Sequence, residues 1–391
     1  MSNEVRHLKR LTSYIKSMFL RLFAMLATIF FCWQPSLAQP DRQPPLRVGV
    51  VGLVHTHVHW ILGRENRGDI EIVGIAEPNR ELAQRYAAQH GYSMDLVYPT
   101  IEEILEKTKP EAVLAFNTIY GHLEVVEKCA PKGIHVMVEK PLAVSLEHAR
   151  KMEALARQHG IHLLTNYETS WYGSNHAAKR LIESEAQTFG PVRKIVVHDG
   201  HPGPIEIGCN PEFLEWLTDP VLNGGGALTD FGCYGANLST WLMNGRKPES
   251  VVAVTQQIKP HLYPKVDDEA TIILSYPEAQ AILQASWNWN YNRKDMEVYC
   301  RSGYVICLNR DEMKIMRSEK EGAITQQTEA PMSPFDDPFS YLEAVVRGRI
   351  TVAPSDLSAL ENNMTVVEIL EAAKISAKEG RRVALKELKG Q

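Results

Sequence analysis

Two kinds of hydrophobic pattern divide the chain after residue 45. In the first part, short aliphatic runs alternate with stretches of helical spacing. The runs predict buried strands at Leu46–Val51, Ile70–Ala76, Ala112–Phe116, Ile134–Val138 and Ile161–Thr165. The stretches between them predict helices at Arg80–His90, Ile101–Lys107, Leu123–Ala130 and Ser145–His159. Thr100 and Glu103 have the spacing of a capping box before the second helix. This rhythm predicts an α/β fold that begins with a Rossmann domain, a doubly wound parallel sheet over residues 46–166.

From about Gly190, longer strands follow one another without helices between them. They are predicted at Lys194–His198, Val251–Ile258, Ala270–Ser275, Ala281–Trp289, Met296–Cys300 and Tyr304–Leu308. Turn signals separate several of these strands, so we expect a large, mostly antiparallel sheet. A final helix is predicted at Asp356–Lys378, with Ser355 as its N-cap. Residues 167–391 are thus expected to form a second, α+β domain for substrate binding and oligomerisation, onto which the C-terminal helix packs back.

The first 38 residues differ from the rest. Five basic residues precede the apolar run Leu22–Trp33, and Ser36-Leu37-Ala38 offers small side chains for cleavage, which is typical of a signal peptide (1–38). The run has 12 residues, whereas a membrane span needs roughly 20; an uncleaved anchor is the alternative. A Pro- and Gln-rich linker follows at residues 39–45. We therefore expect export, to the periplasm, and no stable membrane insertion after cleavage.

Composition and charge narrow the function classes. With 44% hydrophobic and 23% charged residues, the chain has the composition of a globular enzyme. The net charge of −5, less the +4 of residues 1–38, leaves about −9, so a basic surface for nucleic acid is not indicated. The cysteines after residue 38 lack metal-site or disulfide-framework spacing and are Cys129, Cys209, Cys233, Cys300 and Cys307.

The first strand runs into a turn of sequence Gly-Leu-Val-His-Thr-His, where a dinucleotide-binding fold has its glycine-rich loop. Gly52 suits the tight turn, but Val54 and His57 replace the second and third glycines of the usual fingerprint. The residues of this turn expected to bind the cofactor are Gly52, Leu53, Val54, His55 and Thr56.

Glu77 follows the second strand, 25 residues after Gly52. A carboxylate there would accept hydrogen bonds from both ribose hydroxyls and would repel a 2′-phosphate, so NAD is favoured over NADP. The alternative is a solvated loop charge.

His55, His57 and His59 alternate in an H-x-H-x-H pattern that raises the question of a metal site. Alternation brings side chains together only on a strand, and this segment is expected to turn into a helix. No carboxylate or later histidine set stands at metal spacing, so we expect no metal and place His55 at the cofactor loop.

Two further segments carry candidate chemistry. The fifth strand ends in Glu139-Lys140-Pro141, where a partly desolvated lysine beside a nicotinamide would have a lowered pKa and could help to deprotonate a hydroxyl. Further on, flexible glycines lead to Asp230, and Tyr234 follows four residues later, which would put both on one face of a helical first turn. The structural alternatives are an ordinary strand exit and a helix-terminal acid with a half-buried tyrosine.

Taken together, these residues resemble the Gfo/Idh/MocA family, named after glucose-fructose oxidoreductase and inositol dehydrogenase. The resemblance extends from Leu46 to the closing helix, and the tyrosine looks more like the secreted glucose-fructose oxidoreductase branch. It implies that Lys140 is the catalytic lysine, Asp230 a substrate-hydroxyl ligand and Tyr234 the proton-transfer residue. Asn117 and His122 fall where the family has a Thr-Pro-Asn stretch followed by histidine, so the resemblance adds them, with Glu139 and Lys140, to the cofactor site.

Substrate clues lie in the second domain. His201 and Trp287, with Lys140, Asp230 and Tyr234, are the expected substrate residues. The alternating Trp287, Trp289 and Tyr291 would share one sheet face, where they could stack on a sugar or instead form sheet core or a subunit interface. Because sheets of the family commonly pair face to face, the resemblance also implies a homo-oligomer through the C-terminal sheet.

The sequence therefore predicts an exported NAD-dependent oxidoreductase that acts on a secondary hydroxyl of a sugar or glycoside. Free NAD is scarce outside the cytoplasm, so the cofactor is expected to stay bound and to be recycled. One alternative is an NAD-dependent glycosidase that oxidises a ring hydroxyl transiently and eliminates the aglycone. The other is a non-catalytic sugar- or partner-binding protein on the same fold.

Overall fold

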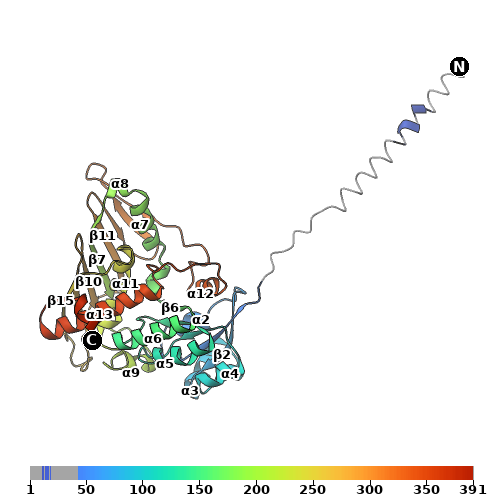
Figure 1. The fold of residues 1–391 in the computed structure, drawn as a ribbon, viewed down its shortest axis with the longest axis horizontal. Helices are drawn as coiled ribbons and strands as arrows, with labels where there is room; N and C mark the ends of the chain where they lie inside the picture. Colours follow the sequence, from blue (N-terminus) through green and yellow to red (C-terminus); the bar gives the residue numbers. More distant parts are fainter. Residues whose placement is uncertain (1–10, 13, 17, 19–42, 391) are drawn as a thin grey trace. The chain divides into compact units, whose positions relative to one another are not determined.

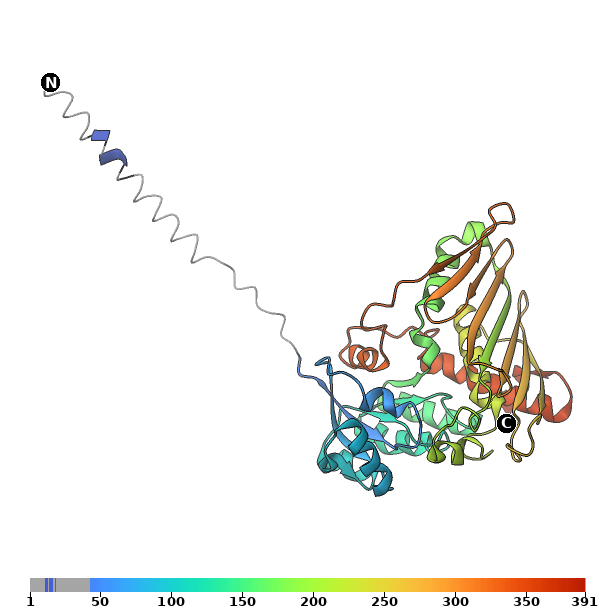
Figure 2. The same cartoon turned by 180° about the vertical axis from the view of Figure 1, so that it is seen from behind.

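The computed structural model describes residues 11–12, 14–16, 18 and 43–390. Most of the predicted signal peptide (1–38) and most of the linker (39–45) therefore lie outside the described residues. Residues Pro45–Gln391 form one compact unit that contains two sheets (Figures 1 and 2). Within the described part of the chain, every helix is too short or too polar to cross a bilayer.

The first sheet is wholly parallel and has the strand order β3-β2-β1-β4-β5-β6. Its strands are β1 Leu46–Val51, β2 Ile70–Ala76, β3 Val97–Tyr98, β4 Ala112–Ala115, β5 His135–Glu139 and β6 Leu163–Asn166. The helices between them are α2 Val58–Leu62, α3 Arg80–His90, α4 Ile101–Lys107, α5 His122–Cys129 and α6 Leu146–His159. This confirms the predicted Rossmann sheet, whose strand order reverses between β1 and β4, the place where such sheets bind ligands.

Local sequence explains why these elements begin where they do. The hydroxyl of Thr100 accepts the N–H of Glu103 at the start of α4, and that of Ser145 accepts the N–H of His148 at the start of α6. Gly49 in β1 lets α4 pack closely, because a Cβ there would lie 3.0 Å from Ile104.

The second sheet has nine strands in the order β14-β13-β12-β11-β7-β10-β9-β8-β15. They are β7 Val192–Gly200, β8 Ser250–Gln256, β9 Glu269–Ser275, β10 Gln280–Ser286, β11 Arg293–Cys300, β12 Tyr304–Cys307, β13 Glu312–Met316, β14 Ala323–Gln327 and β15 Val383–Ala384. The pair β7 and β10 is parallel, and the other pairs are antiparallel. The predicted mostly antiparallel sheet is confirmed.

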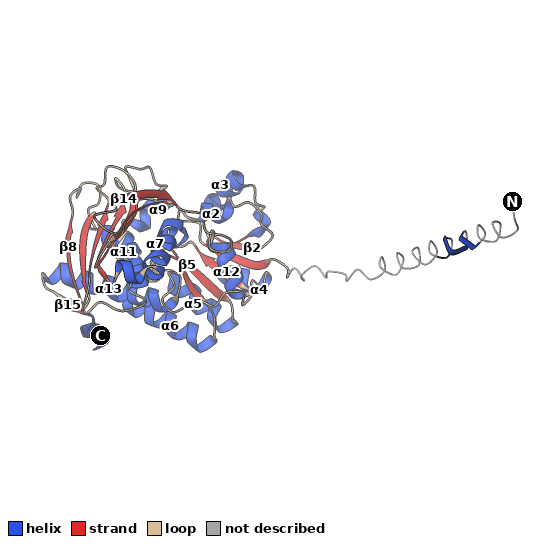
Figure 3. Cartoon of the chain, turned by 90° about the horizontal axis from the view of Figure 1, so that it is seen from above, coloured by secondary structure: helices blue, strands red, loops and turns tan. Residues whose placement is uncertain are grey.

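Helices cover one face of this second sheet (Figure 3). The helices after β6 are α7 Gly173–Ser184, α8 Ala186–Phe189, α9 Pro211–Leu217, α10 Ala227–Asp230, α11 Gly232–Leu242, α12 Pro338–Val346 and α13 Leu360–Glu379. α11 and α13 pack against each other and on the sheet, and α13 also contacts α6 and β6 of the first half. The last helix therefore joins the two sheets through a shared core.

The predicted start of the last helix is wrong. The helix begins at Leu360, and Ser355 does not cap it. The carboxylate of Asp356 instead accepts the backbone N–H of Ser358 at 3.0 Å, which stabilises a turn in competition with helix.

Candidate active site

The turn after β1 has the tight geometry that a dinucleotide loop requires. Gly52 has a φ of +79°, and a Cβ there would lie 2.7 Å from the Cα of Asn117. Hydrogen bonds within the protein engage four of the six backbone N–H groups of residues 52–57, leaving those of Val54 and Thr56. Two backbone donors of this turn therefore remain for a pyrophosphate.

Glu77 lies at the carboxyl end of β2, as predicted, and is buried. Its two carboxylate oxygens accept the N–H groups of Leu53 (2.9 Å) and Asn79 (2.8 Å). Burial raises the pKa of this carboxyl, although both hydrogen bonds oppose the rise. Each oxygen retains a lone pair for a further donor, such as a ribose hydroxyl.

Three polar atoms along the same sheet edge fit a ligand with hydrogen-bonding groups. They are Thr56 Oγ1, Asn117 Oδ1 and His122 Nε2, all buried and without a hydrogen-bond partner in the described residues. The other ring nitrogen of His122 donates to the carbonyl of Leu142, 3.1 Å away, and burial lowers the pKa of this imidazole to about 4. Because buried polar groups are normally paired, these atoms match the chemistry of a nucleotide held at the crevice by the residues predicted for it.

Lys140 and Asp230 form a buried ion pair between the two halves of the molecule. Lys140 follows β5, and its Nζ lies 2.5 Å from Asp230 Oδ1, at the end of α10. Burial alone would lower the pKa of Lys140, but Asp230 and other nearby groups raise it above its usual value. The lowered pKa expected from the sequence is therefore wrong for this state, because the sequence did not reveal that Asp230 is the direct partner of the lysine.

Asp230 is held on both carboxylate oxygens. The indole N–H of Trp287 donates to Oδ2 at 3.0 Å, while Lys140 occupies Oδ1. Burial raises the pKa of Asp230, but Lys140 lowers it by more than burial raises it. The pKa therefore lies below its usual value. The pair is thus an ammonium and a carboxylate at neutral pH.

Tyr234 lies beside this pair, although not on the same helix as Asp230. The chain breaks at Phe231, so Asp230 ends α10 and Tyr234 belongs to the first turn of α11, which corrects the single helical turn predicted. The Lys140 Nζ is 5.1 Å from the centre of the Tyr234 ring. Burial raises the pKa of this phenol well above its usual value, so it is protonated.

The predicted aromatic stripe does not lie on a sheet face, because β10 ends at Ser286. Trp287 is fully buried, and its indole N–H donates to Asp230. Trp289 instead packs under the guanidinium of Arg293, 4.4 Å from the ring centre, and Tyr291 is 55% exposed. The regular alternation ends with the strand, so the three rings separate.

A cavity of about 680 Å³ opens beside these residues. His201, a predicted substrate residue, lines it together with Phe231, Glu168 and Lys294. The Lys294 Nζ also lies 5.2 Å from the ring centre of Tyr234, which connects the cavity to the Lys140–Asp230 pair. Burial lowers the pKa of His201 to about 4, so its imidazole is neutral.

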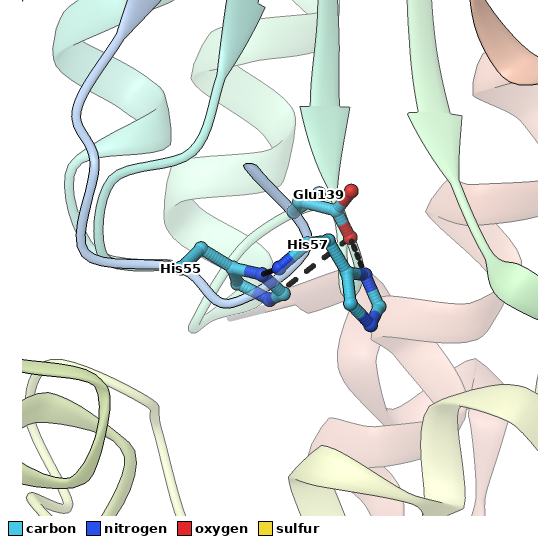
Figure 4. Close-up of side chains that lie close together, drawn as sticks. All are labelled: His55, His57 and Glu139. Carbon is cyan, nitrogen blue, oxygen red and sulfur yellow. Dashed lines mark hydrogen bonds and ion pairs between the residues drawn. The ribbon is translucent and has the colours of Figure 1, made fainter. Parts of the chain in front are cut away.

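The three histidines of the H-x-H-x-H segment have separate environments. His57 Nδ1 lies 2.9 Å from Glu139 Oε2, and His55 Nε2 lies 3.9 Å from the same oxygen (Figure 4). His59 instead bonds to His90 at 2.8 Å. The sequence missed this carboxylate because Glu139 is far along the chain.

His55, His57 and Glu139 are close enough to suggest a metal site. However, the Nδ1 of His55 accepts the backbone N–H of His57, 3.1 Å away. Burial lowers the pKa of His55 well below its usual value, so the ring is neutral and its proton is on Nε2, the nitrogen that faces Glu139. Nε2 therefore has no lone pair for a metal in this arrangement.

Sequence reasoning missed α9, which covers the glycine turn. Its Phe213 and Trp216 rings pack on His55, with ring centres 5.2 and 5.5 Å away, and the Trp216 indole donates to the carbonyl of Val54. Glu212 accepts the hydroxyl of Tyr86 from α3 at 2.6 Å. The signal was present, since Pro211 stands at a helix start and apolar residues follow at helical spacing.

Comparisons with known proteins agree with this architecture. A trans-1,2-dihydrobenzene-1,2-diol dehydrogenase of Sus scrofa is 26% identical over 234 residues, 59% of this chain and 65% of that protein. A 1,5-anhydro-D-fructose reductase of Ensifer adhaerens is 26% identical over 205 residues, 52% of this chain and 59% of that protein. The chain thus spans less than two thirds of the length of these relatives. An aldose-aldose oxidoreductase from Caulobacter crescentus has the same fold, with a TM-score of 0.71 at 22% identity over 87% of this chain and 99% of that chain.

Family models cover both halves. Residues 46–167 match the oxidoreductase family with an NAD-binding Rossmann fold, and residues 175–306 match the GFO/IDH/MocA C-terminal domain. The chain therefore belongs to the GFO/IDH/MocA family of NAD-binding oxidoreductases.

Proposed function

We propose that this protein is an exported NAD-dependent oxidoreductase that acts on a secondary hydroxyl of a sugar or glycoside and keeps its cofactor bound. The observation that carries the proposal is the contact of Lys140 with Asp230 and Tyr234 beside the 680 Å³ cavity. An ammonium, a carboxylate and a phenol can together hold and protonate the oxygen atoms of a polyol. The N-terminal sequence pattern supports export, and Glu77 at the end of β2 supports NAD over NADP.

Each of these residues has a distinct role in the proposed reaction. A bound NAD would supply the hydride acceptor, held by the turn at Gly52, by Glu77 and by the polar edge at Asn117 and His122. Asp230, fixed by Trp287, accepts a hydrogen bond from a neighbouring sugar hydroxyl. Lys140 donates to the reacting oxygen and stabilises its negative charge, and Tyr234 exchanges the proton with that oxygen.

A mass-spectrometric experiment tests the proposal. Protein purified without added nucleotide is denatured, and the released cofactor is identified; we expect NAD(H) in near-stoichiometric amount. The native protein is then incubated with a panel of glycosides and scored for keto sugars. Aglycone release without net NADH would identify the transient-oxidation glycosidase instead. Absence of nicotinamide together with failure to bind added NAD would contradict the proposal.

Two variants test the assignment of the site. Tyr234→Phe removes the proton-transfer hydroxyl with little change in volume, and Lys140→Ala removes the ammonium. Loss of positioned acid–base catalysis costs about 10²- to 10⁴-fold in rate. We expect losses in this range in kcat for both variants, and activity retained in both would refute the assigned roles.

We further propose that the open face of the second sheet forms a homo-oligomer. Val196, Ile282 and Ile273 lie side by side across β7, β10 and β9 on the face opposite α11 and α13, and all three are half-exposed. Such an aliphatic row supports burial against a second copy. Light scattering of Ile282→Glu checks this: we expect a smaller particle than the wild type, and an unchanged mass would contradict the proposal.

A further inference from the structure

His57 occupies the place of the third glycine of the dinucleotide fingerprint, directly before α2. Instead of leaving space for helix packing, its side chain reaches to the end of β5 and bonds to Glu139 at 2.9 Å (Figure 4). The imidazole stacks on Trp60, with ring centres 3.7 Å apart and planes 15° apart. The ring is therefore fixed from one face and from one edge.

A chain of hydrogen bonds fixes Glu139 in turn. Its Oε1 accepts the amide of Asn166 at 2.7 Å, and the amide oxygen of Asn166 accepts the indole N–H of Trp171 at 2.9 Å. Burial raises the pKa of Glu139, but His57, His55 and these bonds lower it to about 2, so the carboxylate is charged. A charged carboxylate only accepts hydrogen bonds, which places a proton on the Nδ1 of His57.

The opposite nitrogen of His57 is available to a ligand. In the tautomer that has its proton on Nδ1, Nε2 carries a lone pair and can accept a hydrogen bond. Nε2 has no partner among the residues described and is not enclosed, since the side chain is 16% exposed.

We propose that His57, oriented by Glu139, accepts a hydrogen bond through Nε2 from a hydroxyl group of the bound ligand, either a ribose hydroxyl of the nucleotide or a hydroxyl of the sugar. A carboxylate-oriented imidazole is suited to this because its tautomer is set before the ligand arrives. The inference rests on the proposed function and adds a specificity-determining residue to it. It also gives a physical reason for a histidine at a position where the fingerprint has glycine.

The experiment has two arms that separate the two sources of the hydroxyl. The first measures the dissociation constant of NAD+ for nucleotide-stripped protein by calorimetry. The second measures KM and kcat for the sugar with the cofactor-loaded protein. One neutral hydrogen bond is worth about 1 kcal/mol, so we expect His57→Ala to weaken one of the two affinities by about 3- to 10-fold. His57→Gln should retain part of that affinity.

Glu139→Gln tests the orientation separately from the loss of the ring. The amide of the new side chain can donate to Nδ1, which moves the imidazole proton to Nε2 and turns the acceptor into a donor. We expect a loss of affinity similar to that of His57→Ala, and nitrogen NMR of labelled histidine should show the tautomer change. His59→Gln is the matched control, because His59 pairs with His90 and should leave both affinities unchanged.

Thermal melting of each variant identifies any that fail to fold. If a variant fails, the inference is tested instead by the tautomer of His57 in the wild-type protein. A protonated Nε2 in the wild-type protein, or unchanged affinity in both arms for folded His57→Ala, would overturn the inference. Stoichiometric metal in the purified protein would also overturn it, because Nδ1 would then be a ligand. If the wild type binds no NAD+ at all, that result contradicts the proposed function by itself. The role of His57 is then tested by measuring how tightly the wild type and His57→Ala bind the sugar directly.

Discussion

At the scale of single residues, the charge states of the site favour one direction of proton transfer. Lys140 and Asp230 are charged, and burial raises the pKa of Tyr234 well above its usual value. A protonated phenol beside an ammonium can give its proton to a carbonyl oxygen at once. Oxidation of a hydroxyl requires this phenol to have lost its proton first.

The rates of sugar oxidation and of keto-sugar reduction should therefore change in opposite directions as pH rises. As pH rises towards the raised pKa of Tyr234, the phenolate becomes more populated, so we expect kcat for sugar oxidation to increase. Reduction of the corresponding keto sugar should decrease over the same interval. Rates measured in both directions between pH 6 and roughly 10 check this, and an alkaline rise that persists in Tyr234→Phe would assign it to another group.

Gly52 provides a second test at the scale of one residue. Its positive φ and the 2.7 Å approach of Asn117 both oppose a side chain. Gly52→Ala should therefore lower the free energy of unfolding by about 2–4 kcal/mol, from backbone strain plus overpacking. Gly133→Ala is the control, because its φ is +70° but no atom lies within 4 Å of the added Cβ. Chemical denaturation of both should show the smaller loss at residue 133, and equal losses would contradict the steric argument.

At the scale of elements, α9 covers the glycine turn. It rests on His55 through Phe213 and Trp216 and on α3 through Glu212. This cover agrees with the proposal that the cofactor stays bound between turnovers.

Removal of the α9 contacts should accelerate the exchange of bound cofactor. Trp216→Ala deletes the ring on His55 and the hydrogen bond to Val54, and we expect bound NADH to dissociate about tenfold faster, which corresponds to about 1.4 kcal/mol of lost closure. Stopped-flow displacement of NADH fluorescence measures this rate. Arg157→Ala serves as the control, since Arg157 pairs with Glu153 and Glu361 on α6 and α13. Equal rates in the two variants would show that α9 does not limit exchange.

Periodicity predicted the longer elements well and the shorter ones poorly. β1, β2, α3 and α4 have the predicted bounds because each buries a full repeat of apolar residues. β3 and β15 have two residues each, too few for a repeat, and the break at Phe231 depends on packing between helices. In the site, the motif after β5 indicated Lys140. Its partner Asp230 stands 90 positions away in the sequence, and only the tertiary fold brings the two together. The sequence could therefore predict neither this partner nor the direction of the Lys140 pKa shift.

At the scale of the whole molecule, Arg64 ties distant segments together. Its guanidinium bonds to Asp69 at 2.6 Å and to Asp337, the N-cap of α12, at 3.0 Å. Ser340 in the same helix also accepts from it. The cluster is largely buried, so its charges depend on one another.

Loss of this cation should destabilise the entire fold. Arg64→Ala leaves two carboxylates without their cation, and breaking a buried pair costs about 3–5 kcal/mol. Burial raises the pKa of Asp69, but Arg64 and Ser340 lower it well below its usual value. The folded state therefore gains stability from this carboxylate at neutral pH and loses it as pH falls. Urea unfolding at pH 7 and at about pH 2 should show a smaller difference for Arg64→Ala than for the wild type, because this stability is lost below the ordinary pKa of the carboxyl; an equal difference would place the acid sensitivity elsewhere.

The edge position of β15 has a consequence for the order in which the chain can fold during synthesis. The six-stranded sheet is complete once residue 166 has been made, whereas β8 receives its outer neighbour only at residues 383 and 384. Lys140 can thus reach its place on a finished sheet while Asp230 and Tyr234 have yet to be made. The Lys140–Asp230 pair therefore forms late, and a chain interrupted before α13 would carry a complete first sheet beside an unfinished second one.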